Sequence, residues 1–280
     1  MSLAITDRTP DVDGASAAAA VDRGLSWLVQ RQRADGGWPL SDQVPASTWT
    51  TAPAVLTLAV LRRHAQQVER GAGWLTARKG TGYPLVARLV GWIVGSEDPR
   101  KVNELDPTIA GWPWAENSFS WVEPTSLAVL ALQGALTIGT VADAQAAHER
   151  LSEAVRWFVD RRSPQGGWNY GNRRVLGQDV DPYPDTTAWA LLALAGIAGP
   201  DVTYASLERL RALMRSNTSA LARALTVLAY RAHGENATEI TRLLALQCAG
   251  ESMDTPPAEN RTRALALLAL AGPALPFHIK

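Results

Sequence analysis

Carboxylate side chains lie among aromatic residues in two polar segments of this sequence. They are Glu123 in the first segment and Asp179, Asp181 and Asp185 in the second. Trp121 stands two residues before Glu123, and Tyr183 stands two residues before Asp185. A carboxyl group that poor solvation keeps protonated can act as a general acid, and aromatic faces stabilise a cation formed beside them. The residue types therefore predict a site for proton-initiated carbocation chemistry.

Apolar helical blocks follow both segments, and their alignment extends the candidate site. Five Ala/Leu-rich blocks share one register, and the residues three positions before them are Trp49, Glu123, Asp185, Ser219 and Arg261. If the blocks line a barrel, these residues surround one of its mouths, where the long loops 38–49, 111–123 and 168–185 would build a pocket. The predicted substrate-binding residues are Trp49, Trp114, Glu116, Trp121, Tyr183, Trp189 and Arg261.

A repeated segment indicates how the blocks are arranged. Residues 23–38 and 153–168 have nearly the same pattern, a helical run that stops at Gly-Gly-Trp and is followed by a loop and an apolar helix. A helix, turn and helix that recur along a chain are typical of a helical array or toroid.

The apolar spacing is helical throughout, and Gly and Pro separate the runs. We expect outer helices at 15–33, 68–78, 144–161, 206–215 and 238–248, and inner helices at 52–61, 125–136, 186–197, 221–232 and 263–271. The prediction is one all-α domain at 15–280, built from about five antiparallel hairpins, after a flexible segment at 1–14. The five hairpins either close a ring or leave a gap that a second copy of the chain fills.

The first repeat resembles the QW motif of squalene cyclases and class II terpene cyclases. Its places are filled by Arg23, Gly24, Trp27, Leu28, Gln32, Gly36 and Trp38. The second repeat has Arg162 where the motif has Gln, and a third copy opens at Arg70 and is interrupted. The resemblance implies an α-α toroid, a fold that these cyclases share with protein prenyltransferase β subunits and complement thioester domains.

The same family carries an Asp-x-Asp-Asp-Thr-Ala motif whose middle Asp protonates an alkene or epoxide. The segment 183–188 resembles it and places Asp185 on the acid, with Tyr183 and Thr186 in place of the outer carboxylates. Asp179 and Asp181 could replace those carboxylates in space. The resemblance thus implies cyclisation or isomerisation of a linear isoprenoid, without a metal unless a diphosphate substrate brings Mg²⁺.

Other interpretations remain open from the residues alone. Asp185 stands where a helix N-cap belongs, and Asp is a favoured cap. A toroid with altered acids could also bind a lipid or a partner protein without catalysis. A prenyltransferase β-like zinc site is disfavoured because Cys248 has no acid two residues before it, and a thioester domain lacks its Gly-Cys-Gly-Glu-Gln sequence.

Composition limits the remaining classes. The 280 residues carry 27 basic and 27 acidic side chains, so a nucleic-acid partner is not expected. One cysteine gives no disulfide. The start of the chain lacks the features of a signal peptide, and no apolar run reaches the ~18 residues of a membrane span. We expect a cytoplasmic protein, and we interpret the apolar segment 84–95 as a packing helix or as a lid that touches a membrane.

Overall fold

The computed structural model describes residues 14–44, 46–81, 105–175, 178–250 and 260–272. Within these ranges the chain is helical apart from loops and one short hairpin of strands. The helices are α1 (Gly14–Arg31), α2 (Thr51–Val60), α3 (Ala65–Ala77), α6 (Val122–Thr137), α7 (Ala144–Arg161), α8 (Pro184–Leu194), α9 (Pro200–Met214), α10 (Ala220–Ala232), α11 (Thr238–Gly250) and α12 (Asn260–Leu270). The strands β1 (Arg174–Val175) and β2 (Gln178–Asp179) pair antiparallel.

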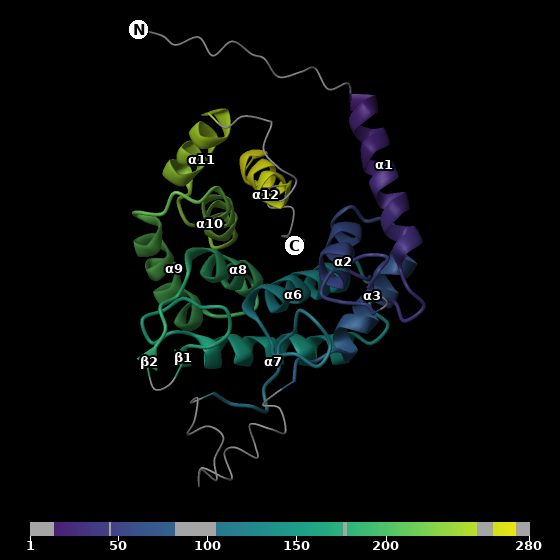
Figure 1. The fold of residues 1–280 in the computed structure, drawn as a ribbon, viewed down its shortest axis with the longest axis horizontal. Coiled ribbons are helices and arrows are strands. Elements are labelled where there is room, and N and C mark those ends of the chain that lie inside the picture. Colours follow the sequence, from purple (N-terminus) through teal and green to yellow (C-terminus); the bar gives the residue numbers. More distant parts are fainter. Residues whose placement is uncertain (1–13, 45, 82–104, 176–177, 251–259, 273–280) are drawn as a thin grey trace.

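The described helices form two layers. The apolar helices pack in the order α2, α6, α8, α10, α12, and α3, α7, α9 and α11 lie outside this row (Figure 1). Each outer helix therefore precedes the inner helix of its hairpin, as predicted. The inner helices are rich in Ala and Leu, whose small and flexible side chains let neighbouring helices approach closely, and α8 is buried from Thr186 to Leu194.

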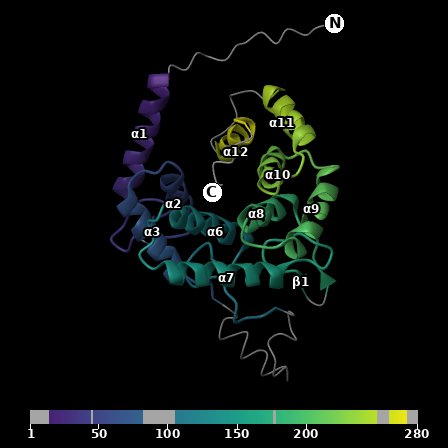
Figure 2. The same ribbon diagram turned by 180° about the vertical axis from the view of Figure 1, so that it is seen from behind.

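The row of inner helices is curved. Arg261 at the start of α12 forms an ion pair with Glu123 at the start of α6, although α8 and α10 lie between these helices in the row. The Arg261 guanidinium also lies over the Trp189 ring of α8. Both views show α2 and α12 at the two ends of the row (Figures 1 and 2). The row bends so that α12 turns towards its concave side.

Buried apolar side chains form one cluster that runs from Leu25 on α1 to Ala269 on α12. A contiguous cluster of this kind is what a single domain has. Helix α1 joins it only near its end, because residues 14–24 are exposed and Leu25 is buried. Trp27, which the repeat suggests is a packing residue, is 55% exposed under the guanidinium of Arg31.

Three tryptophans share one hydrogen-bonding pattern, and we call each of them a Trp turn. They are Trp38, Trp112 and Trp168. The indole N–H of each donates to a carbonyl near the end of the preceding outer helix, namely that of Leu28, Leu75 and Phe158, at 2.7–2.9 Å. The backbone N–H of each donates to a threonine hydroxyl at the start of the next inner helix, namely Thr51, Thr125 and Thr187. Each Trp turn thus joins the two helices of one hairpin.

Trp112 completes the repeat that is interrupted after Leu75. The alignment of the repeats missed this copy because of its long spacing. Some 36 residues lie between Leu75 and Trp112, whereas Trp38 and Trp168 each follow their bonded helix residue by about ten. The segment 84–95, predicted to be a packing or lid helix, lies within this insertion and outside the described residues.

The substitution of Gln by Arg in the second repeat keeps the contact between hairpins. Gln32 donates to the carbonyl of Gln67, the third residue of α3, at 2.9 Å. Arg162 donates to the carbonyl of Val202, the third residue of α9, at 2.6 Å. Either side chain therefore links one hairpin to the first turn of the next outer helix.

We expect Gly166→Ala to destabilise the fold much more than Gly139→Ala. Both glycines have positive φ, +85° and +69°, a conformation that costs an alanine about 1–2 kcal/mol. A Cβ at Gly166 would also lie 2.5 Å from the carbonyl oxygen of Ala205, whereas one at Gly139 meets nothing within 4 Å. Overpacking adds about 1–3 kcal/mol, so urea unfolding should give a total cost of roughly 2–5 kcal/mol for Gly166→Ala. Equal costs for the two variants would contradict this close contact of the turn with α9.

The all-α prediction is confirmed for the described residues, and the short β1–β2 hairpin is the part that it missed. Of the segment 1–14, only Gly14 is described, and it begins α1. None of the described helices has both the length and the apolar character needed to cross a membrane.

Candidate functional site

Two carboxylates and one arginine meet where the inner helices begin, and we call Glu123, Asp185 and Arg261 the acid cluster. Glu123 is the second residue of α6, and Asp185 is the second residue of α8. The two side chains are near enough for the charge of Asp185 to act on the Glu123 carboxyl. Arg261 Nη2 lies 2.5 Å from Glu123 Oε1. The common register of the inner helices therefore brings together three of the residues that the sequence alignment selected.

Burial raises the pKa of the Glu123 carboxyl above its ordinary value of 4.5. The Arg261 guanidinium acts in the opposite direction, because it favours the ionised form, and the negative charge of Asp185 raises the pKa further. The side chain of Glu123 is 18% exposed, while that of Arg261 is 45% exposed. The less exposed member of the pair is thus the acid, and the more exposed member is its counter-ion.

Exposed aromatic rings surround the acid cluster. Trp121, Tyr170 and Tyr183 are each more than a third exposed, and Tyr170 contacts both of the others, with ring centroids 6.3 Å from Trp121 and 5.1 Å from Tyr183. Burial raises the pKa of the Tyr170 phenol, with contributions from Asp185, Tyr183 and Glu123. Trp189 of α8 is buried, and the guanidinium of Arg261 lies over its ring at 5.7 Å from the centroid. Large aromatic side chains left in contact with water beside buried charge are typical of a ligand site.

The Trp turn at Trp168 fixes the start of α8, where Asp185 lies. The hydroxyls of Thr186 and Thr187 both bond to Trp168, at its carbonyl oxygen and its backbone N–H respectively. Pro184 occupies the first helical position, which suits its fixed φ. Tyr183 is the N-cap residue of α8, and its side chain makes no capping hydrogen bond. The interpretation of Asp185 as the N-cap is therefore wrong. The charge of Asp185 acts instead on Glu123 and Tyr170.

Asp179 and Asp181 lie on the exposed hairpin that precedes α8. Asp179 is part of β2, and its carboxylate is 3.8 Å from Arg174 on β1. The side chain of Asp181 is 89% exposed and lies 3.5 Å from Arg209 on α9. Both are thus paired with arginines away from Arg261, and the structure does not place them as spatial replacements for the missing motif carboxylates.

The remaining predicted residues gather in a second place, which we call the tryptophan hollow. It has a volume of about 350 Å³ and lies between α3, the start of α2 and the loop after Trp112. Trp49 and Trp114 contact each other edge to face across it, at 4.7 Å between ring centroids, and Glu116 lies on its rim. Pro124 also lines it, so the hollow and the acid cluster are adjacent to the same turn of α6.

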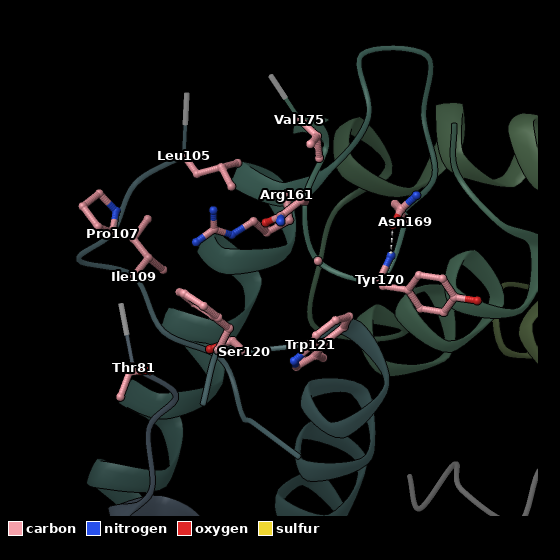
Figure 3. A pocket seen from close by; sticks show the side chains of 13 residues that line it. Thr81, Leu105, Pro107, Ile109, Ser120, Trp121, Arg161, Asn169, Tyr170 and Val175 are labelled. Carbon is pink, nitrogen blue, oxygen red and sulfur yellow. Dashed lines mark hydrogen bonds between the residues drawn. The ribbon is translucent and has the colours of Figure 1, made fainter. Parts of the chain in front are cut away.

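Another cavity, of about 360 Å³, borders the aromatic residues of the acid cluster (Figure 3). Leu105, Pro107 and Ile109 line one side of it, and Trp121 and Tyr170 the other. Figure 3 shows the Tyr170 ring directed away from those apolar residues. Trp121 and Tyr170 therefore belong both to the wall of this cavity and to the surroundings of the acid cluster.

Tyr170 is the site residue that the sequence prediction did not select. It stands two residues after the Trp turn at Trp168, just as Trp114 stands two residues after Trp112. The alignment of the Trp turns would have indicated it, but Trp112 was not recognised as a turn.

No protein-family model matches this sequence, and no curated protein sequence matches it. Among the described residues, no group of three or more His, Cys, Asp or Glu side chains could hold a metal ion.

Proposed function

We propose that this chain protonates an isoprenoid at the acid cluster and so cyclises or isomerises it, with Glu123 as the general acid. The observation that carries the proposal is the buried carboxyl of Glu123, with a raised pKa, next to a second carboxylate and exposed aromatic rings. Asp185, which the sequence resemblance selects as the acid, becomes the neighbouring carboxylate whose charge helps to keep Glu123 protonated.

The architecture that this proposal implies is an α-α toroid. Its support is the curved row of inner helices and the Trp turn that recurs at the same place in three hairpins. In such a ring the first turns of all inner helices share one mouth, and the acid cluster lies at that mouth.

The chemistry needs no oxidant and no co-reactant. The Glu123 carboxyl donates its proton to one carbon of an alkene, whose π electrons form the new C–H bond and leave a carbocation on the other carbon. A second alkene of the substrate attacks that cation and closes a ring, and the final cation loses a proton or takes up water. Solvent then reprotonates Glu123. The exposed rings of Trp121, Tyr170 and Tyr183 supply the electron density that stabilises the cations.

The test is solvent deuterium in the product. We expect the purified chain, incubated in D₂O with linear isoprenoids of 10 to 30 carbons, to give cyclic or isomerised product with deuterium at the carbon that is protonated. Substrates with and without a diphosphate, each with and without Mg²⁺, determine whether a diphosphate is recognised. Gas chromatography with mass spectrometry measures both product and label.

Product without deuterium would exclude protonation as the first step. Absence of product together with a thermal shift on adding an isoprenoid would favour the other candidate, a binding protein without catalysis. If there is neither product nor thermal shift, the isoprenoid proposal is wrong.

A further inference from the structure

The tryptophan hollow differs in chemistry from the acid cluster. Four indole rings surround it, those of Trp49, Trp74, Trp112 and Trp114. Trp112 is buried and forms the floor, whereas the other three are partly exposed. The rings of Trp49 and Trp114 meet at 84°, so no parallel slot lies between them. The hollow therefore offers single aromatic faces to a ligand.

The charged groups of the rim are paired with one another. Arg78 Nη1 lies 2.6 Å from Glu116 Oε1, and its guanidinium lies 5.1 Å from the centroid of the Trp74 ring. Lys79 Nζ lies 2.8 Å from Glu153 Oε2. Glu153 is also 2.6 Å from Arg150 Nη1, so it is shared between two cations. Both cations of the rim thus already have a carboxylate partner, and the rim presents donors and acceptors side by side.

Two of the indole N–H groups in the hollow are available to a ligand. The indole of Trp74 donates to Asp35, and that of Trp112 donates to the Leu75 carbonyl. Within the part of the chain that the structure describes, the indoles of Trp49 and Trp114 donate to no protein group. The hollow therefore combines apolar faces with unused donors, which a purely structural cluster of tryptophans does not need.

These features exclude most classes of ligand. An organic cation would compete with the Arg78 guanidinium for the face of Trp74, because that guanidinium already lies over the ring. An anion would be repelled by the Glu116 carboxylate, and Arg78 is already paired with that carboxylate. A plain hydrocarbon would remove water from the Arg78–Glu116 pair without replacing its hydrogen bonds, at a cost. A nucleobase cannot be held between two parallel rings here, because Trp49 and Trp114 meet at 84°.

A neutral saccharide satisfies every one of these conditions. The C–H groups on one face of a sugar ring carry partial positive charge, and the face of an indole is negative. Its hydroxyls both donate and accept hydrogen bonds, as the carboxylate and guanidinium of the rim and the indole N–H groups require. The volume of about 350 Å³ is at the lower end of the usual range for small-molecule pockets.

We propose that the tryptophan hollow binds a small neutral saccharide, packed against Trp49 and Trp114 and hydrogen-bonded to Arg78 and Glu116. This site does not depend on the isoprenoid chemistry of the acid cluster.

The test follows the indole N–H signals of the whole chain by NMR during titration with methyl β-glucoside, cellobiose and maltose. We expect at least one of these sugars to shift the Trp49 and Trp114 signals with saturation. A stacking contact of about 1.4 kcal/mol corresponds to tenfold in affinity, so Trp114→Ala should weaken binding at least about tenfold. Glu116→Gln, which keeps the shape but removes the carboxylate, should also weaken it.

Trp27→Ala is the matched control, because Trp27 is an exposed tryptophan with an arginine over its ring and does not line the hollow. It should leave sugar binding unchanged. No shift with any of the three sugars would overturn the proposal, and so would equal affinity in Trp114→Ala. Geraniol or choline shifting the Trp49 and Trp114 signals when no sugar does would assign the hollow to a hydrocarbon or a cation instead.

Discussion

Glu123→Gln should lower the rate of isoprenoid turnover by at least about 10²-fold, the usual contribution of a general acid. Gln has the size of Glu and can still accept a hydrogen bond from Arg261, but it has no acidic proton to give. The pH profile of the wild type provides a second measure. Because Glu123 must be protonated, the rate should fall as pH rises through its raised pKa, and this limb should be missing from any residual activity of the variant.

Asp185→Asn is the matched comparison. It removes a negative charge that favours the protonated form of Glu123, so the rate at neutral pH should fall by less than in Glu123→Gln, and the limb of the pH profile should move to lower pH. Circular dichroism and thermal unfolding of both variants check that the fold is retained. The reverse ranking, with Asp185→Asn inactive and Glu123→Gln active, would make Asp185 the acid, as the sequence resemblance implies.

The sequence predicted the helices and the shared register of the inner helices because both are local patterns. Ala/Leu blocks with helical spacing bury helices all round, and a common register puts Glu123, Asp185 and Arg261 at the same end of a layer. The ion pair between Glu123 and Arg261 was not predictable, since it depends on how strongly the row of helices curves. That curvature is set by packing between segments nearly 140 residues apart.

The division of the predicted site residues between the acid cluster and the tryptophan hollow was also not predictable from the sequence. Trp49 and Glu123 occupy equivalent positions in the repeat, yet Trp49 turns into the tryptophan hollow while Glu123 faces Asp185. Which side of the first turn a side chain occupies depends on the loop above it, and these loops differ in length and composition. The arginine partners of Asp179 and Asp181 were not predictable for a similar reason, because they depend on the exposed β1–β2 hairpin and on the loop that follows it.

The Trp turns should dominate the stability of the fold, and Trp168→Ala should cost about 3–5 kcal/mol of unfolding free energy. Trp168 is fully buried, packs edge to face against Phe158 and joins α7 to α8 through its two N–H groups. Trp168→Phe keeps most of the ring but leaves the Phe158 carbonyl without its donor, which costs about 1–3 kcal/mol for a buried acceptor. Urea unfolding of both variants should therefore place the Phe protein between the wild type and the Ala protein.

Trp27→Ala provides the reference for these values, because that side chain is exposed and its loss should change the unfolding free energy by no more than about 0.5 kcal/mol. A loss of less than about 1 kcal/mol in Trp168→Ala would mean that the helices α7 and α8 hold together without the Trp turn. Since the backbone N–H of residue 168 is kept in the Phe variant, its hydrogen bond to Thr187 and the first turn of α8 should be retained. Turnover of the folded Phe variant should therefore stay close to that of the wild type although its stability falls, whereas Trp27→Ala should leave both unchanged.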